Sequence, residues 1–242
     1  MAIDLTGRVC VITGAAEGIG EAIARGFVRR SAQVVATDIQ APQLAEAAMC
    51  LSYDVSDAQR ASGVLREVVE RFGKVDAFIA NAGIMPRQNW DEISSDDWRK
   101  VMNVNLDGAW HGAQAAAKQM TLQGYGKIVF VSSVEVAIGV AVHCHYDAAK
   151  AGLIGLTRAL ARAVGPQGVR VNCVMPGAVQ TQSELRQFPD QEGIARWATE
   201  RQCLPARLQP EAIEPVFAFL CSEESDAITG QVLCADHGLV HY

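Results

Sequence analysis

Short aliphatic runs alternate with segments of helical length along nearly the whole chain, and this alternation restricts the possible folds more than any other feature. Such alternation is typical of a parallel sheet whose strands are joined by helical crossovers. Half of the residues are hydrophobic but only 6% are aromatic, so we expect an aliphatic core, as in buried parallel strands. The seven expected strands are residues 8–13, 33–37, 49–53, 75–80, 127–132, 169–174 and 231–234.

The chain has 242 residues and contains no repeat, low-complexity tract or linker, which predicts one doubly wound α/β domain over residues 1–242. The formal net charge is −6 and no run of Lys or Arg is present, which argues against a nucleic-acid partner. No apolar stretch is long enough to cross a membrane, and residues 1–5 do not resemble a secretory signal. The seven cysteines lack C-x-x-C spacing, so we expect reduced thiols in a cytoplasmic protein.

A glycine-rich turn joins the first expected strand to a helix that runs from Glu21 to Arg30. This is the setting of a dinucleotide-binding loop, because glycines let the backbone approach a pyrophosphate and a helix N-terminus presents free N–H groups. The spacing, G-x-x-x-G-x-G, is a variant of the usual fingerprint. The residues of this turn that we predict to bind a cofactor are Gly14, Glu17, Gly18, Ile19 and Gly20.

Asp38 ends the second expected strand, where an acidic residue can accept hydrogen bonds from the adenosine ribose of NAD. It would also repel the 2′-phosphate of NADP, by ~6–7 kcal/mol before salt screening at a separation of ~5 Å and a dielectric of ~20. No Lys or Arg stands near Asp38 in the sequence, and Glu17 adds no positive charge. We therefore predict NAD as the cofactor.

Further polar residues follow the third and fourth expected strands. Residues 41–48 leave room for only a short helix before the third strand, which Asp54 and Val55 follow. Asp54 could accept a hydrogen bond from the adenine amino group or, with Asp57, cap the next helix, and the spacing leaves both open. The fourth strand closes with Asn81-Ala82-Gly83, where asparagine and glycine permit a tight turn.

A long helix is expected from Ser94 or Ser95 to about Gln123, and Asn105 lies inside it. Asparagine is unfavourable within a helix. Asn105 either opens the helix to a bound water near a site or bonds a neighbouring loop, and the spacing favours neither alternative.

Tyr146 and Lys150 stand four residues apart at the start of the following helix, so their side chains share one face. An ammonium roughly 5 Å from a phenol, at an effective dielectric of ~20, favours the phenolate by ~3 kcal/mol. We therefore expect Lys150 to lower the pKa of Tyr146 and to make it a usable base. Ser132 and Ser133 end the preceding strand, at the same edge of the sheet.

A polar segment of about residues 180–208 follows the strand that ends near Met175-Pro176-Gly177. A long insertion after the carboxyl end of a strand predicts a lid over a binding cleft.

Taken together, these residues resemble the short-chain dehydrogenase/reductase family over essentially the whole chain. The resemblance rests on the following residues in this order: Thr13-Gly14, Gly18-Ile19-Gly20, Asn81-Ala82-Gly83, Asn105, Ser133, Tyr146, Lys150, Asn172 and Pro176-Gly177. It implies a Rossmann-like sheet of seven parallel strands with helices on both faces. It also implies a catalytic tetrad and self-association, most simply as a homotetramer through the helices that carry Asn105 and Tyr146.

The family assigns a role to each member of the tetrad. Tyr146 exchanges a proton with the substrate oxygen, and Ser133 hydrogen-bonds the same oxygen. Lys150 lowers the pKa of Tyr146 and holds the nicotinamide ribose, while Asn105 anchors a water that links Lys150 to solvent. Further cofactor contacts implied by the resemblance are Asp54, Val55, Asn81, Ala82, Gly83, Pro176, Gly177, Val179 and Thr181.

Glu135 departs from the family, since relatives often carry a small or apolar residue there. A pocket-facing Glu135 would favour a polar or cationic substrate, whereas a solvent-facing one would carry no such information. Neighbouring His143, Cys144 and His145 are not well spaced as metal ligands, so no metal is predicted. The candidate substrate contacts are Glu135, His143, Met85, Trp90 and Val140.

The predicted function is an NAD-dependent oxidoreductase that interconverts a small secondary alcohol and its ketone. Two alternatives remain. An NADPH-linked 3-oxoacyl thioester reductase has the same fold, although Asp38 argues against it. A non-catalytic NAD-binding regulator would be expected to carry a damaged tetrad, and this tetrad is whole.

Overall fold

The protein, analysed as a computed structural model, is described over residues 3–241; Met1, Ala2 and Tyr242, the ends of the predicted domain, lie outside the described residues. Within that range, seven parallel strands form one sheet in the order β3-β2-β1-β4-β5-β6-β7. The predicted α/β fold class is therefore confirmed. The strands are β1 (Val9–Thr13), β2 (Gln33–Asp38), β3 (Met49–Ser52), β4 (Ala77–Ala80), β5 (Gly126–Val131), β6 (Val169–Pro176) and β7 (Val232–Ala235).

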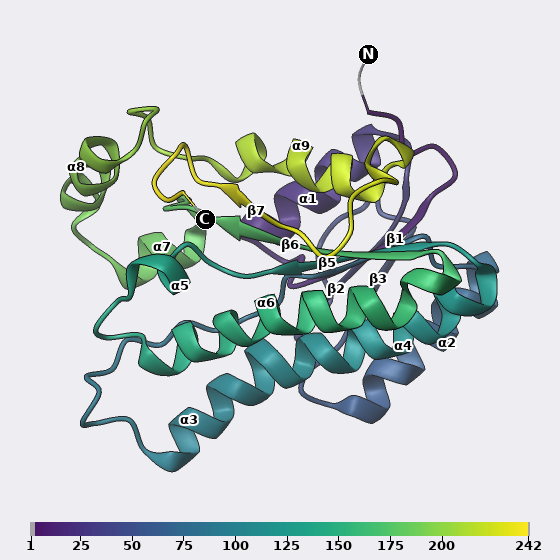
Figure 1. The fold of residues 1–242 in the computed structure, drawn as a ribbon, viewed down its shortest axis with the longest axis horizontal. Coiled ribbons are helices and arrows are strands. Elements are labelled where there is room, and N and C mark those ends of the chain that lie inside the picture. The colour runs from purple at the N-terminus through teal and green to yellow at the C-terminus, as the bar shows by residue number, and fades with distance from the viewer. Residues whose placement is uncertain (1–2, 242) are drawn as a thin grey trace.

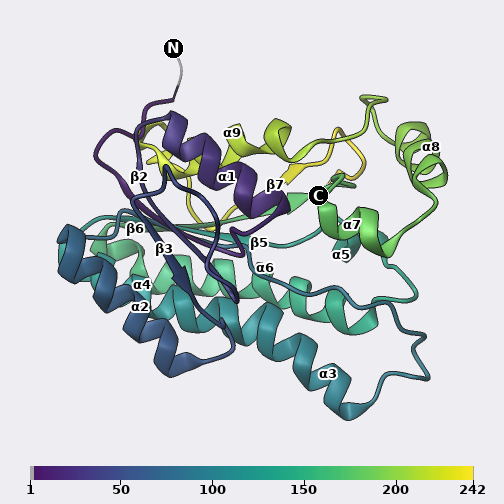
Figure 2. The ribbon, with the colours of Figure 1, turned by 180° about the vertical axis from the view of Figure 1, so that it is seen from behind.

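Helices cover both faces of the sheet (Figures 1 and 2). α1 (Gly18–Arg29) and α9 (Pro210–Cys221) pack side by side on one face, whereas α2 (Ala58–Phe72), α4 (Gly108–Gln123) and α6 (Cys144–Val164) cover the other. Each face buries its own largely aliphatic cluster, as the composition predicts. The shorter elements are α3 (Ser95–Met102), the π-helical turn η1 (Asn103–Asp107), α5 (Glu135–Ile138), η2 (Gly165–Gln167), α7 (Gln182–Gln187), α8 (Gln191–Arg201) and η3 (Glu223–Ser225).

The strand order reverses between β1 and β4, which lie side by side with Ile12 opposite Ile79. Crossovers from β1 lead outward to β2 and β3, and those from β4 lead outward to β5, β6 and β7. Open parallel sheets bind ligands in a crevice at the carboxyl edge beside such a reversal, and here the loops after β1 and β4 mark that position.

Residues 41–48 form turns, so the short helix expected there is wrong. The Ala47 N–H donates to the Leu44 carbonyl oxygen at 3.1 Å, and Leu44 is buried as an anchor in the core. So short a segment could form only a few helical hydrogen bonds against the cost of nucleation, and Pro42 has no N–H to contribute.

The long helix expected over residues 94–123 is instead three elements: α3, η1 and α4. Ser94 begins it with a capping box, in which the Ser94 hydroxyl accepts from the Asp97 N–H at 3.0 Å and Asp97 accepts from the Ser94 N–H. The π-helical turn inserts one extra residue per turn and contains Asn105, whose side chain is fully buried.

All seven cysteines lie among the described residues, and none of them forms a disulfide there. No helix within the described residues has both the length and the hydropathy needed to cross a bilayer.

Candidate active site

The glycine turn after β1 is locked against the turn after β4. The Thr13 hydroxyl oxygen accepts from the N–H groups of Asn81 and Ala82, both at 3.1 Å. The Asn81 side-chain amide donates to the carbonyl oxygens of Thr13 and Gly14, both at 3.0 Å. A Cβ on Gly14 would lie 2.7 Å from Ala82 Cα, and one on Gly20 would lie 2.0 Å from the Gly14 carbonyl oxygen. Both positions therefore require glycine.

The same turn has the features that fit the pyrophosphate and ribose of a nicotinamide dinucleotide. α1 begins with Glu17 as N-cap, and no side chain caps its first N–H groups, which leaves them for an anion. Asp38 accepts from the N–H of Ala16 at 3.0 Å and from the N–H of Ile39 at 2.7 Å. A carboxylate has about four acceptor sites, so capacity remains for ribose hydroxyls.

Asp54 and Val55 have structural partners of their own. Asp57 alone caps α2, accepting from the N–H groups of Gln59 and Arg60, both at 2.9 Å. Asp54 instead accepts from the N–H and hydroxyl of Ser56, at 3.0 and 2.8 Å. The capping alternative for Asp54 is therefore wrong, and its contact with adenine stays a prediction. Val55 is buried against α4.

Lys150 is buried beneath Tyr146. Its Nζ donates to the Val131 carbonyl oxygen at 2.7 Å and lies 5.6 Å from the centre of the Tyr146 ring. The Ser132 hydroxyl donates to the Lys150 carbonyl oxygen at 2.9 Å and so fixes α6 to the end of β5. Burial lowers the pKa of Lys150 to about 8.

The pKa of Tyr146 is raised in this structure, so the prediction that it would be lowered is wrong. Burial is the main cause, because it disfavours the charged phenolate, and the Glu135 carboxylate adds to it. The nearby Ser133 hydroxyl opposes both effects. The sequence showed the amine four residues away but not how deeply the phenol is buried.

Asn105 forms hydrogen bonds to a neighbouring loop, which is one of the two alternatives that the sequence left open. Its side chain accepts from the Ile84 N–H at 2.9 Å and donates to the Ile84 carbonyl oxygen at 2.8 Å. A Cβ on Gly83 would lie 2.5 Å from Asn105 Oδ1 and 3.4 Å from Lys150 Nζ. Asn105 and Lys150 therefore face each other across Gly83, and the helix is opened there by η1.

Glu135 turns toward Tyr146. Its N–H donates to the Ser133 hydroxyl oxygen at 3.1 Å, and its carboxylate lies 2.8 Å from His143 Nδ1. The Glu135 side chain is 21% exposed, whereas that of His143 is 1% exposed. The rings of His143 and Tyr146 meet edge to face, with centres 5.9 Å apart. Asp147, which the sequence did not single out, completes this group; its only sequence signal is its place next to Tyr146.

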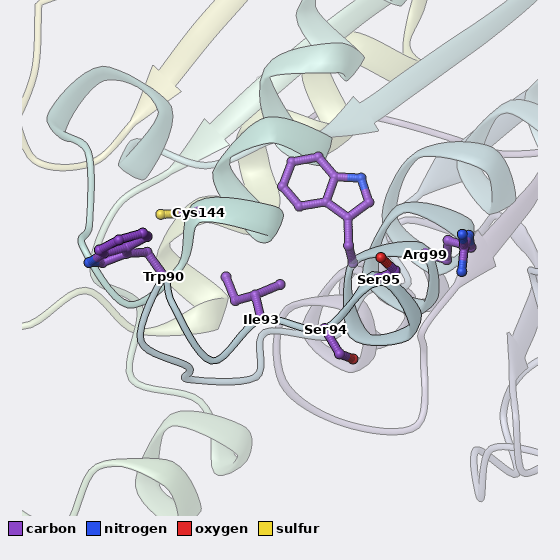
Figure 3. Close-up of a pocket in the computed structure, with 7 residues that line it drawn as sticks. Trp90, Ile93, Ser94, Ser95, Arg99 and Cys144 are labelled. Atoms are coloured by element: carbon purple, nitrogen blue, oxygen red, sulfur yellow. The ribbon is translucent and has the colours of Figure 1, made fainter.

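The remaining predicted substrate contacts are Trp90, Met85 and Val140. Trp90 is 74% exposed and belongs to a surface pocket of about 370 Å³ beside the start of α3 (Figure 3). Met85 and Val140 are half-buried on the loops before α3 and α6. The pocket is lined by Trp90, Ile93, Ser94, Ser95, Trp98, Arg99 and Cys144, and none of these belongs to the tetrad.

The segment 180–208 folds over the glycine turn. The Thr181 hydroxyl caps α7 by accepting from the Glu184 N–H at 3.1 Å, and a Cβ on Gly18 would lie 3.3 Å from the Thr181 side chain. Arg186 forms an ion pair with Glu17, with Nη1 2.9 Å from Oε2. This segment therefore contacts the turn that we predict to bind the cofactor.

Both ends of the segment are fastened together. Val179 pairs with Leu208, and Arg207 bonds both carboxylate oxygens of Glu184 at 2.7 Å. At the end of β6, the Gly177 N–H donates to the Ala235 carbonyl oxygen at 3.0 Å, which places the Pro176–Gly177 corner against β7.

Comparison with known proteins agrees with this geometry. A family model described as enoyl-(acyl carrier protein) reductase matches residues 14–240. The 3-oxoacyl-[acyl-carrier-protein] reductase FabG of Thermotoga maritima is 36% identical over 98% of this chain and 99% of its own length. L-rhamnose 1-dehydrogenase (NAD(P)(+)) of a Sphingomonas species is 34% identical over 97% of both chains.

A solved structure from Sinorhizobium meliloti, described as a candidate short-chain alcohol dehydrogenase, superposes with a TM-score of 0.93 at 31% identity. The superposition covers 99% of this chain and 98% of the chain in that structure. The family match and these relatives identify the chain as an oxidoreductase of the short-chain dehydrogenase/reductase family.

Proposed function

We propose that this protein is an NAD-dependent oxidoreductase that interconverts a secondary alcohol and its ketone. The observation that supports it most is the position of Lys150, which is buried with its Nζ 5.6 Å from the centre of the Tyr146 ring. This group stands at the carboxyl edge of the sheet, the edge to which the glycine turn after β1 also belongs.

In oxidation, the Tyr146 oxygen accepts the proton of the substrate hydroxyl, and in reduction it returns that proton. Ser133 hydrogen-bonds the same substrate oxygen and holds the reacting carbon in place. The positive charge of Lys150 favours the phenolate form of Tyr146 and opposes the effect of burial. Asn105 holds the loop after β4 and orders the surroundings of Lys150. NAD, when bound, accepts or supplies the hydride.

We assign the dinucleotide to the residues that line the crevice between β1 and β4. Asp38 supports NAD over NADP, because it adds negative charge beside the adenosine ribose. The residues proposed to hold NAD are Gly14, Glu17, Gly18, Ile19, Gly20, Asp38, Asp54, Val55, Asn81, Ala82, Gly83, Tyr146, Lys150, Pro176, Gly177, Val179 and Thr181.

The experiment is to mix the purified protein with NAD and a panel of secondary alcohols and to follow NADH absorbance. Turnover of at least one alcohol, absent in Tyr146→Phe, is the expected result. Dinucleotide binding without turnover of any alcohol or ketone in either direction would instead favour a non-catalytic regulator.

A second candidate is an NADPH-linked reductase of 3-oxoacyl thioesters, which the 36% identity to FabG supports. Acetoacetyl thioester offered with NADH and with NADPH separates the two. Faster reduction with NADPH would favour the second candidate over the first.

We also propose that the chain is one domain with segment 180–208 as its lid, that it works in the cytoplasm, and that it assembles as a homotetramer through α4 and α6. Sedimentation analysis of the purified protein tests the assembly.

A further inference from the structure

Three side chains beside Tyr146 have no part in the proposed proton transfer: Glu135, His143 and Asp147. Glu135 Oε2 lies 2.8 Å from His143 Nδ1. Burial and then the Glu135 carboxylate raise the pKa of Asp147, whose Oδ1 is buried and has no partner within the described residues. The other Asp147 oxygen accepts from the Val140 N–H at 3.0 Å. The contacts of this group thus connect α5 with His143, just before α6, and with Asp147, in the first turn of α6.

This group keeps unused hydrogen-bonding capacity. His143 is 1% exposed, and within the described residues its Nε2 has no partner. A carboxylate offers about four acceptor sites, and His143 Nδ1 lies 2.8 Å from one of the two Glu135 oxygens, Oε2. Buried polar atoms left unpaired are costly, so an unpaired nitrogen at this place indicates a ligand with polar groups.

The group also adjoins the position of the reacting oxygen. Ser133, which bonds that oxygen in the proposed reaction, accepts from the Glu135 N–H at 3.1 Å. The His143 ring packs edge to face on Tyr146 with centres 5.9 Å apart. A substrate oxygen between Ser133 and Tyr146 therefore has Glu135 and His143 beside the neighbouring carbon.

We propose that Glu135 and His143 bind a hydroxyl group on the carbon next to the reacting one, so that the substrate is a vicinal diol, a class that includes polyols and sugars. This inference rests on the proposed function. A hydroxyl has one donor and two acceptor sites, so it can donate its proton to the Glu135 carboxylate or to an unprotonated His143 Nε2, and it can accept from a protonated Nε2.

Other substrate classes fit this group less well. A 3-oxoacyl thioester presents a methylene next to the reacting carbon and then a carbonyl oxygen, which has no proton to donate to a carboxylate. A cationic substrate would need a carboxylate without a partner, but Glu135 Oε2 already faces His143 Nδ1 at 2.8 Å. The cluster therefore favours a neutral hydroxyl.

The test compares kcat/KM with NAD for matched pairs that differ by one hydroxyl: cis-1,2-cyclohexanediol and cyclohexanol, and 2,3-butanediol and 2-butanol. A site built around a hydroxyl rejects the analogue that lacks it, so we expect at least one diol to exceed its partner by about 100-fold. In Glu135→Gln that ratio should fall by about tenfold or more, since the amide cannot replace the charged acceptor.

A merely structural role of Glu135 would lower kcat/KM for both members of a pair and leave their ratio unchanged. Glu70→Gln, on the exposed face of α2, is the matched control and should keep the wild-type ratio. NAD titration by fluorescence shows that each variant is folded. Equal rates for diol and mono-alcohol in every pair, or a ratio unaffected by Glu135→Gln, would overturn the inference but not the proposed function. No NAD-linked turnover of any alcohol would overturn both.

Discussion

Lys150 donates a hydrogen bond to the Val131 carbonyl oxygen at 2.7 Å, and this bond fixes the ammonium 5.6 Å from the centre of the Tyr146 ring. The charge that we propose assists Tyr146 is therefore held by the end of β5 as well as by the helix. Burial brings the pKa of Lys150 to about 8, which leaves it mainly protonated at neutral pH.

Tyr146→Phe removes the hydroxyl that transfers the proton. We expect kcat for alcohol oxidation to fall by about 10²–10⁴-fold, the usual contribution of a general acid–base group. Affinity for NAD, measured by fluorescence titration, should change little, because the ring remains. Tyr125→Phe, whose hydroxyl bonds Asp226 and lies outside the site, is the control and should keep wild-type turnover. A Tyr146→Phe enzyme with normal kcat would refute the assigned role.

Glu135→Gln should shift the pH profile of kcat for oxidation. Burial and then the Glu135 carboxylate raise the pKa of Tyr146, and a base works only when deprotonated. Removing the carboxylate charge lowers that pKa, so the acidic limb of the profile moves to lower pH. The measurement is kcat across pH with a substrate that both proteins turn over. A limb that stays in place, or moves to higher pH, would contradict the electrostatic effect of Glu135.

Asp38→Asn should weaken the preference for NAD. The asparagine oxygen can still accept from the Ala16 N–H, which Asp38 does at 3.0 Å, so the glycine turn is kept while the charge is lost. We expect the ratio of kcat/KM for NADH to that for NADPH to fall by at least about tenfold, a difference of about 1.4 kcal/mol. Asp54→Asn is the control for lost charge, because Asp54 bonds Ser56. An unchanged ratio in Asp38→Asn would mean that other groups select the cofactor.

Tyr53→Phe should stabilise the protein. Tyr53 is 2% exposed, and its hydroxyl has no hydrogen-bond partner among the described residues. Removing an unsatisfied buried hydroxyl should raise the free energy of unfolding by about 1 kcal/mol. Urea denaturation measures the change. In Tyr125→Phe, where the hydroxyl donates to Asp226 at 3.3 Å, the same deletion should bring no gain. A loss of stability in Tyr53→Phe would show that its hydroxyl is satisfied in solution.

The fold was largely predictable, because each parallel strand is a short aliphatic run and the glycine turn has a strong local pattern. Where prediction failed, the deciding contact was distant in sequence. Residues 41–48 are shaped by the burial of Leu44, which competes with helix formation over so short a segment. The π-helical turn at Asn105 accompanies its two hydrogen bonds to Ile84, a residue of another loop.

The site was predicted less completely than the fold. Spacing placed Tyr146 and Lys150 on one helix face, but the direction of the Tyr146 pKa depends on burial, which spacing does not reveal. Whether Glu135 faces the site could not be decided, because that depends on where α5 turns after β5. Asp147 was missed because its proximity to Glu135, a residue of α5, has no local sequence pattern.

The ion pair between Arg186 and Glu17 has a consequence for the speed of the catalytic cycle. Its side chains are 61% and 42% exposed, so dissolved ions screen their attraction. The attachment of α7 to the glycine turn after β1, which we propose holds the cofactor, therefore weakens as ionic strength rises. If the product dinucleotide leaves the protein past this contact, the rate of its dissociation increases at high salt concentration. The rate of the chemical step, which takes place deeper in the protein, does not change.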